Sequence, residues 1–391
     1  MSGKLWVING NLVLPDRVVK GHIEVDDGII AGIHPERRGP RDLENAEIVD
    51  AEGMFVLPGL IDIHGDAIEK EVQPRPNTLF PLDTAFFELE KKLAASGITT
   101  MYHSLSLGVG LSLRGVDVLL RMLEFITARK TNRSMVRHRI HLRYEILYQS
   151  LMDIAERLIA DGTVDYFSYM LHAPGQGQYK RAGAFEAYVM KNQGVDREEV
   201  KEIVEDIERL VGEIDWERLT QLIDFARAKG ISVASHDDDS IDKVDRAIGL
   251  GASVVEFPLN VETAVYAASN DVFVCVGAPN IVRGQSHDRN MSALDAVKAE
   301  AADVLCSDYY PPSMLQAVFR LVQEGVSLHA AANMASLNPA QAVGIDRRLG
   351  SIEPSKFADL LLVEDKAGYP DLRRTIVQGV SVYQANYYCP E

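Results

Sequence analysis

Potential metal ligands follow apolar stretches of this chain, at positions where strands are expected to end. The six candidates are His64, Asp66, Glu145, His172, His236 and Asp308. His64 and Asp66 follow the apolar run 60–63 and are two residues apart, so on an extended backbone their side chains point the same way. Three imidazoles and three carboxylates can hold two divalent ions joined by a carboxylate and a water of lowered pKa. The pattern predicts a two-metal centre, with Glu145 as the bridging candidate and Asp308 as the catalytic general base.

The same residues also have purely structural interpretations. A single histidine at a strand end is more often a hydrogen-bonded polar residue than a metal ligand. Glu145 could instead pair with Arg143 or Arg139 on a solvated face. Residues 237–239 are all aspartate, and they either orient His236 or cap the next helix. Six such residues in order at strand ends favour the metal centre over these separate roles.

Two loops have the composition of a site for an anionic ligand. Residues 173–181 combine glycines, amides and two cations, and residues 277–287 follow an apolar strand. Arginine suits bidentate contacts to phosphate, although a solvated surface loop can have a similar composition. The candidate substrate-binding residues are Arg75, Gln176, Asn280, Arg283, Ser286 and His287.

Alternating strands and helices between residues 58 and 345 must position these side chains. Helices are expected at 83–96, 115–129, 313–324 and 329–335, and buried strands at 98–102, 140–146, 231–235, 254–257, 272–276 and 304–307. The alternation predicts an α/β fold, a (β/α)8 TIM-like barrel whose active site lies at the C-terminal ends of its strands. A doubly wound sheet is the alternative, but no Gly-x-Gly-x-x-Gly motif follows an early strand.

Short strands separated by turn residues occupy both ends of the chain. Asn9-Gly10 is expected to be a turn that ends the first strand. Residues 358–363 and 375–383 are again strand-like. The economical interpretation is one small β-sandwich domain to which both chain ends contribute. The predicted domains are this sandwich, of residues 1–57 and 346–391, and a hydrolase barrel of residues 58–345.

Composition and charge restrict the class of protein. The 391 residues carry a net charge of -17, which argues against a nucleic-acid partner. No apolar run reaches the ~18 residues of a membrane span, and the first residues lack the apolar core of a signal peptide. Cys275, Cys306 and Cys389 have no Cys-x-x-Cys spacing and favour a reducing compartment. We expect a cytoplasmic enzyme with a small-molecule substrate and no membrane partner; the oligomeric state, a homo-oligomer included, stays open.

The motif GLIDIHGD, at residues 59–66, resembles the opening of the metal-dependent amidohydrolase superfamily. It departs at Asp66, where that superfamily usually has histidine. Further blocks resemble, in the same order, one branch of that superfamily, a diphosphatase family of phosphonate breakdown. Among them are IDIHGDAIEKEVQPRPN, HLRYE, HAPGQGQY, ASHDDDS and GAPNIVRGQSH. The resemblance spans nearly the whole chain, with further departures at Leu171 and Asn260.

This resemblance implies a hydrolase that converts α-D-ribose 1-methylphosphonate 5-triphosphate, a phosphorylated ribose, to the 5-phosphate and pyrophosphate. It also implies that the six candidate ligands hold two divalent metal ions. Imidazole and carboxylate ligands suit Zn, and three carboxylates are compatible with Mn or Fe. Two alternatives stay open: hydrolysis of an amide or cyclic amide on the same fold, and a metal-free binding or assembly subunit. The arginines of the loops favour the phosphorylated substrate, since a neutral amide needs no cations.

Overall fold

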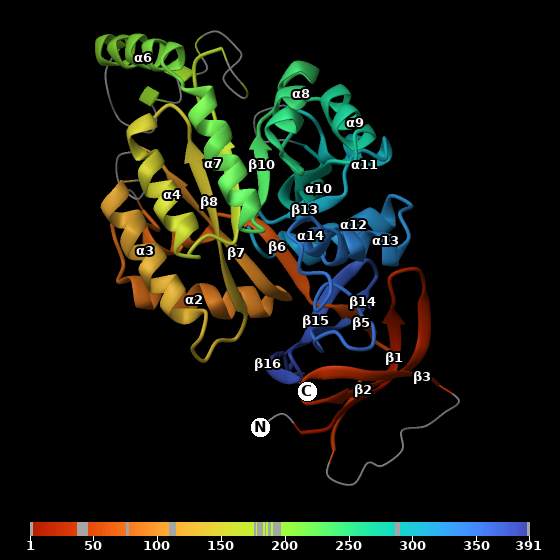
Figure 1. Ribbon diagram of the computed structural model, residues 1–391. Coiled ribbons are helices and arrows are strands. Elements are labelled where there is room, and N and C mark those ends of the chain that lie inside the picture. The colour runs from red at the N-terminus through yellow and green to blue at the C-terminus, as the bar shows by residue number, and fades with distance from the viewer. Residues whose placement is uncertain are drawn as a thin grey trace.

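The computed structural model of the chain contains a barrel and a separate sheet (Figure 1). It describes residues 3–36, 46–75, 78–108, 115–175, 177, 183, 185–186, 189–190, 197–285 and 290–388. In Figure 1 the strands from both chain ends lie beneath the barrel, and the barrel strands point their C-terminal ends towards the top of the view. No helix in the described ranges is long and apolar enough to cross a membrane.

Eight parallel strands form the barrel and are hydrogen-bonded in chain order. They are β6 (Leu60–Gly65), β7 (Ile98–Leu107), β8 (Arg137–Glu145), β9 (Tyr166–Met170), β10 (Ser232–His236), β11 (Val254–Glu256), β12 (Phe273–Gly277) and β13 (Val304–Cys306). Nearly all of their residues are buried, because helices cover the outer face and side chains fill the interior. The (β/α)8 barrel predicted from the alternation is confirmed, with β7 longer than expected.

Helices follow the barrel strands and cover their outer face (Figure 1). They are α1 (Ala67–Val72), α2 (Leu82–Ala95), α3 (Val116–Arg129), the 3-10 helix η2 (Gln149–Leu151), α4 (Met152–Ala160), α6 (Arg197–Gly212), α7 (Trp216–Ala228), α8 (Ile241–Leu250), α9 (Val261–Ser269), α10 (Ala278–Arg283), α11 (Ala293–Lys298), α12 (Ser313–Gln323), α13 (Leu328–Met334) and α14 (Leu337–Ala342). In α3, Leu119, Met122 and Ile126 recur at helical spacing and are all buried. Asp215 starts α7, since its side chain accepts a hydrogen bond from the backbone N–H of Arg218.

The barrel is closed by the residues that follow its last strand. Asp308 pairs with Gly65 of β6 in a parallel bridge. The backbone N–H of Asp308 donates to the carbonyl of His64 at 2.9 Å, and the N–H of Asp66 donates to the carbonyl of Asp308 at 2.8 Å. Three predicted metal ligands therefore lie on the seam between the first and last strands, and barrel closure fixes their backbones.

Strands from both chain ends form a second, eight-stranded mixed sheet. They are β1 (Leu5–Val13), β2 (Val18–Asp26), β3 (Ile29–Pro35), β4 (Glu47–Asp50), β5 (Phe55–Pro58), β14 (Leu360–Lys366), β15 (Tyr369–Val377) and β16 (Val380–Gln384). β5 joins the two ends, because it is parallel to β1 and antiparallel to β14. Hydrogen bonds link all eight strands into one sheet; a two-layer sandwich and its exact domain limits stay predictions.

Two expected strand limits in this sheet are wrong. β1 continues through Asn9-Gly10 with a shift of register, because Asn9 takes a left-handed conformation (φ 57°) and its Nδ2 donates to the Asp50 carboxylate at 3.0 Å. The pair is a β-bulge and not a turn. Residues 375–383 form two strands instead of one. Gln378 and Gly379 both have positive φ, 47° and 76°, which suits a two-residue hairpin turn.

Candidate metal centre

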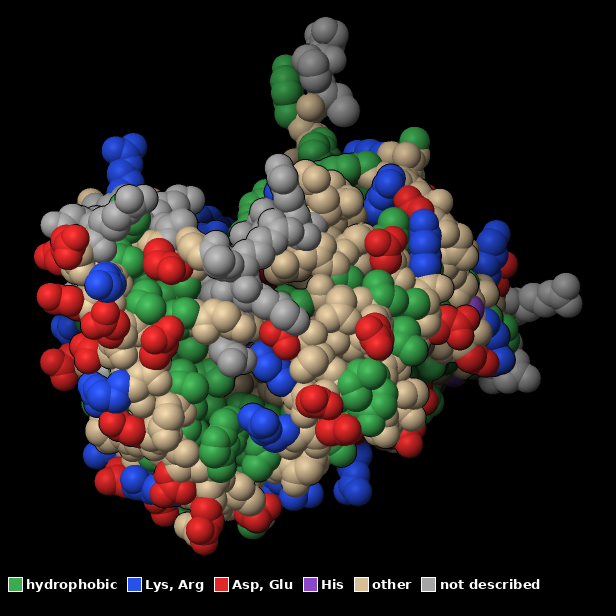
Figure 2. All heavy atoms as spheres, turned by 90° about the horizontal axis from the view of Figure 1, so that it is seen from above, with side chains coloured by type: hydrophobic (Ala, Val, Ile, Leu, Met, Phe, Trp, Pro, Cys, Tyr) green, Lys and Arg blue, Asp and Glu red, His purple; other side chains and the backbone are tan. Residues whose placement is uncertain are grey.

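A cavity of about 560 Å³ opens at the C-terminal ends of the barrel strands. Figure 2 looks onto this face, where a hollow lies near the centre with Lys and Arg side chains beside it. Predicted metal ligands line the cavity: His64, Asp66, His172, His236 and Asp308. The sixth, Glu145, joins the group through a contact with His172. The structure thus brings together six side chains from five separate parts of the sequence.

His172 is held between two carboxylates. Its Nδ1 lies 2.7 Å from Oε2 of Glu145, and its backbone N–H donates to Oε1 of the same residue at 3.2 Å. Its Nε2 lies 3.8 Å from Oδ2 of Asp237. Although burial disfavours the charged imidazole, these two carboxylates raise the pKa of His172 to about 9. Ligand atoms of His172, His236 and Asp237 all lie within 4.8 Å of one another, which is close enough to coordinate one ion.

Glu145 and Asp237 have roles that differ from their first interpretation. Both oxygens of Glu145 are engaged by His172, which is the arrangement of a carboxylate that orients a metal-binding imidazole. Its role as a bridging ligand stays a prediction. Asp237 was expected to orient His236 or to cap a helix, and its Oδ2 lies 3.4 Å from Nδ1 of His236. Its carboxylate also belongs to the ligand group around His172, so Asp237 is a further candidate ligand.

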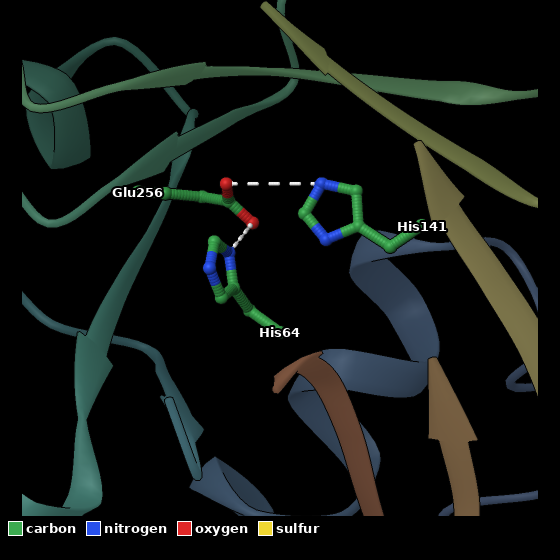
Figure 3. A group of neighbouring side chains, drawn as sticks. All are labelled: His64, His141 and Glu256. Atoms are coloured by element: carbon green, nitrogen blue, oxygen red, sulfur yellow. Dashed lines mark ion pairs between the residues drawn. The ribbon is translucent and has the colours of Figure 1, made fainter. Parts of the chain in front are cut away.

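His64 ends β6 and faces a carboxyl group inside the barrel (Figure 3). Its Nδ1 lies 3.0 Å from Oε1 of Glu256, which is the last residue of β11 and is fully buried. The hydroxyl of Tyr166 donates to the same oxygen at 3.1 Å. Burial lowers the pKa of His64 well below its usual value, so the ring is neutral. Because Nδ1 faces Glu256, Nε2 is the ring nitrogen directed away from this carboxyl group.

His141 supports the same carboxyl group from beneath the cavity. Figure 3 shows the rings of His64 and His141 both pointing towards Glu256, and Nε2 of His141 lies 3.9 Å from Oε2 of that residue. The two ring nitrogens of His141 lie 3.0 Å from the hydroxyl oxygen of Ser104 and 2.8 Å from that of Ser168. Ligand atoms of His64, His141 and Glu256 also lie within 4.8 Å of one another, so these three side chains are a second group close enough to hold an ion.

Asp308 and Asp66 lie on opposite sides of the barrel seam. Burial, together with the charge of Asp66, raises the pKa of Asp308 to about 7. A carboxyl group with a pKa near neutrality can take up and release a proton efficiently at neutral pH. A divalent cation bound beside it would favour the ionised form, which is the form able to act as a base.

Three cavity residues take a left-handed conformation within two residues of the end of a barrel strand. They are Asp237 (φ 56°), Phe257 (φ 54°) and Asp308 (φ 53°). Residues other than glycine rarely adopt this conformation, and it costs free energy. Each of the three donates its backbone N–H to a carbonyl of the neighbouring strand at 2.9 Å. Barrel hydrogen bonds thus hold a strained backbone at the point where candidate ligands leave the strands.

Buried polar atoms indicate where a metal ion fits. Within the described residues, Oδ1 of Asp66 is buried and has no hydrogen-bond partner. Nδ1 of His236 and Oδ2 of Asp237 are also buried, and their mutual contact at 3.4 Å lies outside hydrogen-bond geometry. A buried polar atom without a partner costs free energy, which a coordinated cation would recover. Imidazole nitrogen and carboxylate oxygen are donors for Zn, Mn and Fe. The side chains present therefore fit a divalent metal centre.

Comparison with known proteins gives the family. A model of the "Amidohydrolase family" matches residues 185–383. Over 383 residues the sequence is 32% identical to "Alpha-D-ribose 1-methylphosphonate 5-triphosphate diphosphatase" of Escherichia coli (strain K12), covering 96% of this chain and 99% of that protein. The chain belongs to the amidohydrolase family.

Solved structures show the same fold at lower sequence identity. L-hydantoinase from Arthrobacter aurescens has a TM-score of 0.66 and 18% identity, with 100% of this chain and 98% of that chain covered. A Xaa-Pro dipeptidase has a TM-score of 0.67 and 15% identity, with 98% of this chain and 100% of that chain covered. These similarities support the amidohydrolase barrel and carry no information about the substrate.

The predicted substrate-binding residues of this amidohydrolase have different placements. Asn280 lines the cavity, but its amide holds a loop: Nδ2 donates to the carbonyl of Met291 and Oδ1 accepts from the N–H of Ala293, both at 3.1 Å. Arg283 is exposed at the cavity mouth, with Nη1 3.4 Å from the hydroxyl of Tyr309. Arginine at the mouth fits the predicted contact with an anionic ligand.

The remaining substrate-binding assignments stay predictions. Arg75 is exposed, forms an isolated bridge with Thr78 and is absent from the described residues that line the cavity. Gln176, Ser286 and His287 lie outside the described residues. Asn260, a departure from the family branch, accepts the N–H of Thr263 at 2.8 Å and so caps α9.

Three residues of the site were not predicted as such: His141, Arg143 and Glu256. On β8, His141 and Arg143 precede Glu145 at two-residue spacing, which places all three on one face of the strand. That alternation of polar and apolar residues was the available signal. Glu256 is the last residue of β11, as Glu145 is of β8. A polar residue at the end of an apolar strand was the signal used for the other candidates, and it could also have identified Glu256.

Proposed function

We propose that this amidohydrolase hydrolyses α-D-ribose 1-methylphosphonate 5-triphosphate to the 5-phosphate and pyrophosphate. The observation that carries the proposal is the relative that bears this activity in its name and is 32% identical over 96% of this chain. The matched region also covers 99% of that relative. Local similarity to an adenine deaminase or an L-hydantoinase covers only 20% and 24% of this chain.

The charge of the cavity supports a phosphorylated substrate. The chain carries a net charge of -17, yet the cations Lys70, Arg143 and Arg283 line the cavity. Nζ of Lys70 lies 4.3 Å from the ring centre of Tyr309, at the same mouth as Arg283. Cations grouped in one cleft of an acidic protein raise the local concentration of an anionic ligand.

We assign the metal-binding roles to the side chains that converge in the cavity. His172, His236 and Asp237 would hold one divalent ion, and the seam residues His64, Asp66 and Asp308 would hold a second, with Zn as our first expectation and Mn or Fe as alternatives. When bound, such ions lower the pKa of water and polarise a phosphoryl oxygen. Glu145 and Glu256 would fix the orientation of the two imidazoles that they contact.

Asp308 is our candidate for the general base. Hydrolysis breaks the P–O bond between the α-phosphoryl group and the leaving pyrophosphate, and the oxygen of the attacking water enters a phosphoryl group. The water must lose a proton as it attacks. The carboxylate of Asp308 lines the cavity and can accept that proton when it is ionised.

Phosphorus NMR of the products tests the proposed function. The purified chain is incubated with Zn or Mn and the ribose triphosphate, and we expect pyrophosphate and the 5-phosphate to appear in equal amounts. Hydantoin and dihydroorotate are included as cyclic-amide substrates. Release of orthophosphate as the first product, or hydrolysis of a cyclic amide with an unreacted triphosphate, would contradict the proposal.

A further inference from the structure

Arg143 is a buried cation that faces the cavity from β8. Arg143 is only 7% exposed to solvent, although it lines the cavity. Its Nη2 lies 3.2 Å from Nε2 of His236, a candidate metal ligand. The guanidinium therefore lies deep in the mouth, next to the metal centre, whereas Arg283 and Lys70 are exposed at the rim.

Other arginines of the same strand have carboxylate partners, and Arg143 has none. Nη1 of Arg139 lies 2.9 Å from the Asp165 carboxylate, and Arg137 pairs with Asp359. Among the described residues, no carboxylate oxygen lies within ion-pair distance of Arg143, and its Nε is buried without a hydrogen-bond partner. Asp308 is near enough for its charge and that of Arg143 to attract, but Arg143, unlike the other two arginines of β8, has no carboxylate in direct contact among the described residues.

A buried guanidinium without a counter-ion is costly. Moving a charge out of water has a desolvation penalty, which the attraction of a well-placed opposite charge can offset. A neutral imidazole such as His236 offers one acceptor and no charge, and it cannot satisfy the five donors of an arginine. A ligand with several anionic oxygens would supply both the charge and the acceptors.

We propose that Arg143 binds the oxygens of the phosphoryl group that is attacked, and that it stabilises the charge of the transition state. Its place beside His236 puts a bound oxyanion next to the metal centre and below the rim cations. The fork of an arginine matches two phosphoryl oxygens, which Lys cannot reproduce. This inference rests on the proposed function, but its anion-binding part is measurable without turnover.

Thermal unfolding with inorganic phosphate tests the anion-binding part. Phosphate should raise the melting temperature of the metal-loaded chain in a concentration-dependent manner, because it binds the folded state alone. Arg143→Met should abolish most of this shift. The matched control is Arg139→Met on the same strand, which should lower the melting temperature but keep the phosphate shift. The proposal is overturned if phosphate raises the melting temperature of Arg143→Met as much as that of the wild type. It is also overturned if acetate raises the wild-type melting temperature as much as phosphate does and this effect is lost in Arg143→Met.

Chemical rescue tests the catalytic part. Arg143→Ala should lower the rate of pyrophosphate release by about 10²–10³-fold, the usual cost of a lost oxyanion donor. Added guanidinium, at concentrations below those that unfold the protein, should restore part of the rate. Methylammonium should restore less, and Arg143→Lys should remain impaired, since an ammonium lacks the planar fork. A near-wild-type rate in Arg143→Ala, or equal rescue by both cations, would contradict the role.

The two proposals fail separately. If the wild-type chain releases no pyrophosphate from any triphosphate but loses its phosphate shift on Arg143→Met, the proposed function fails and the anion site stands. If the wild-type chain turns over and Arg143→Met matches it in both assays, the proposed function stands and the inference about Arg143 fails.

Discussion

Nδ1 of His64 faces Glu256 at 3.0 Å, and Nε2 is the ring nitrogen directed away from this carboxyl group. A fully buried carboxyl group in this place fixes both the tautomer and the direction of the ring. The hydroxyl of Tyr166 holds the same carboxyl group in turn. At the scale of single residues, the direction of the His64 ring therefore depends on Glu256 and Tyr166.

Glu256→Gln should weaken metal binding. Glutamine keeps the size of the side chain and can still accept from Tyr166, but it no longer carries the charge that favours the required tautomer of His64. We expect the affinity for Zn to fall about 10–100-fold, the usual effect of losing such a partner. Competition with a chromogenic chelator measures it, with the exposed Glu262→Gln as control. Equal affinities in the two variants would sink the positioning role.

Asp308→Asn should slow turnover while leaving the fold intact. Asparagine keeps the shape and the backbone position of the residue but cannot accept the proton of the attacking water. The rate of pyrophosphate release should fall by ~10² or more. Asp295→Asn, at an exposed position of α11, is the control and should be neutral. A rate near that of the wild type would remove Asp308 from the role of general base.

The sequence was a good guide to the site wherever a ligand ended an apolar run. All six candidates could be predicted to converge, because the ends of parallel barrel strands meet at one mouth. Five of them line the cavity, and Glu145 contacts His172. Glu256 was overlooked, although it ends a buried strand in the same way. The absence of a counter-ion for Arg143 could not be predicted, because it depends on distances between elements that no spacing in the sequence fixes.

A second buried polar group links three elements away from the cavity. His103 on β7 lies 2.9 Å from His138 on β8, which in turn lies 3.1 Å from Glu90 on α2. All three side chains are buried. Burial lowers the pKa of His103 well below its usual value of 6.5, so this ring stays neutral in the folded protein.

This neutral histidine makes the packing of β7, β8 and α2 sensitive to acid. The unfolded chain takes up a proton on His103 below about pH 6.5, and the folded chain does not. The contribution of neutral His103 to the free energy of unfolding is therefore complete above that pH. It is lost as the pH falls, by at most about 1.4 kcal/mol per pH unit. Urea unfolding at pH 7.5 and 5.5 should show a smaller loss for His103→Gln than for the wild type. Identical losses would contradict the assignment.

Gly65 allows β6 to lie close to both of its neighbours at the barrel seam. A Cβ atom there would lie 2.6 Å from Cε of Met101 and 2.7 Å from Oγ of Ser307. Gly65→Ala should therefore lower the stability by about 1–3 kcal/mol, the usual cost of overpacking, and disturb the adjoining ligands. Gly249→Ala on α8, where a Cβ meets nothing within 4 Å, is the matched control and should be neutral or stabilising. Melting temperatures of both variants decide between these outcomes.

Helices and barrel strands were predictable because their signals are local. Apolar residues at helical spacing in α3 are visible in the sequence. The bulge at Asn9-Gly10 was not predictable, because the same pair also suits a turn. The choice between bulge and turn depends on Asp50, which holds the side chain of Asn9 from 41 residues away.

At the scale of the molecule, an acidic protein presents a cavity with cations at two depths. Lys70 and Arg283 are exposed at the mouth, and Arg143 is buried beside the candidate metal ligands. Barrel closure passes through the backbone of His64 and Asp308, so the fold and the site are built at the same seam. This arrangement suits a substrate whose anionic chain enters from the mouth and ends at the metal centre.

We propose that this amidohydrolase cleaves a phosphoanhydride and not an amide. The most direct measurement is kcat/KM for pyrophosphate release from α-D-ribose 1-methylphosphonate 5-triphosphate, compared with ATP and with hydantoin under the same metal concentrations. We predict that the ribose triphosphate is the best of the three and that hydantoin is not hydrolysed. Hydrolysis of hydantoin with no release of pyrophosphate from either triphosphate would contradict the claim.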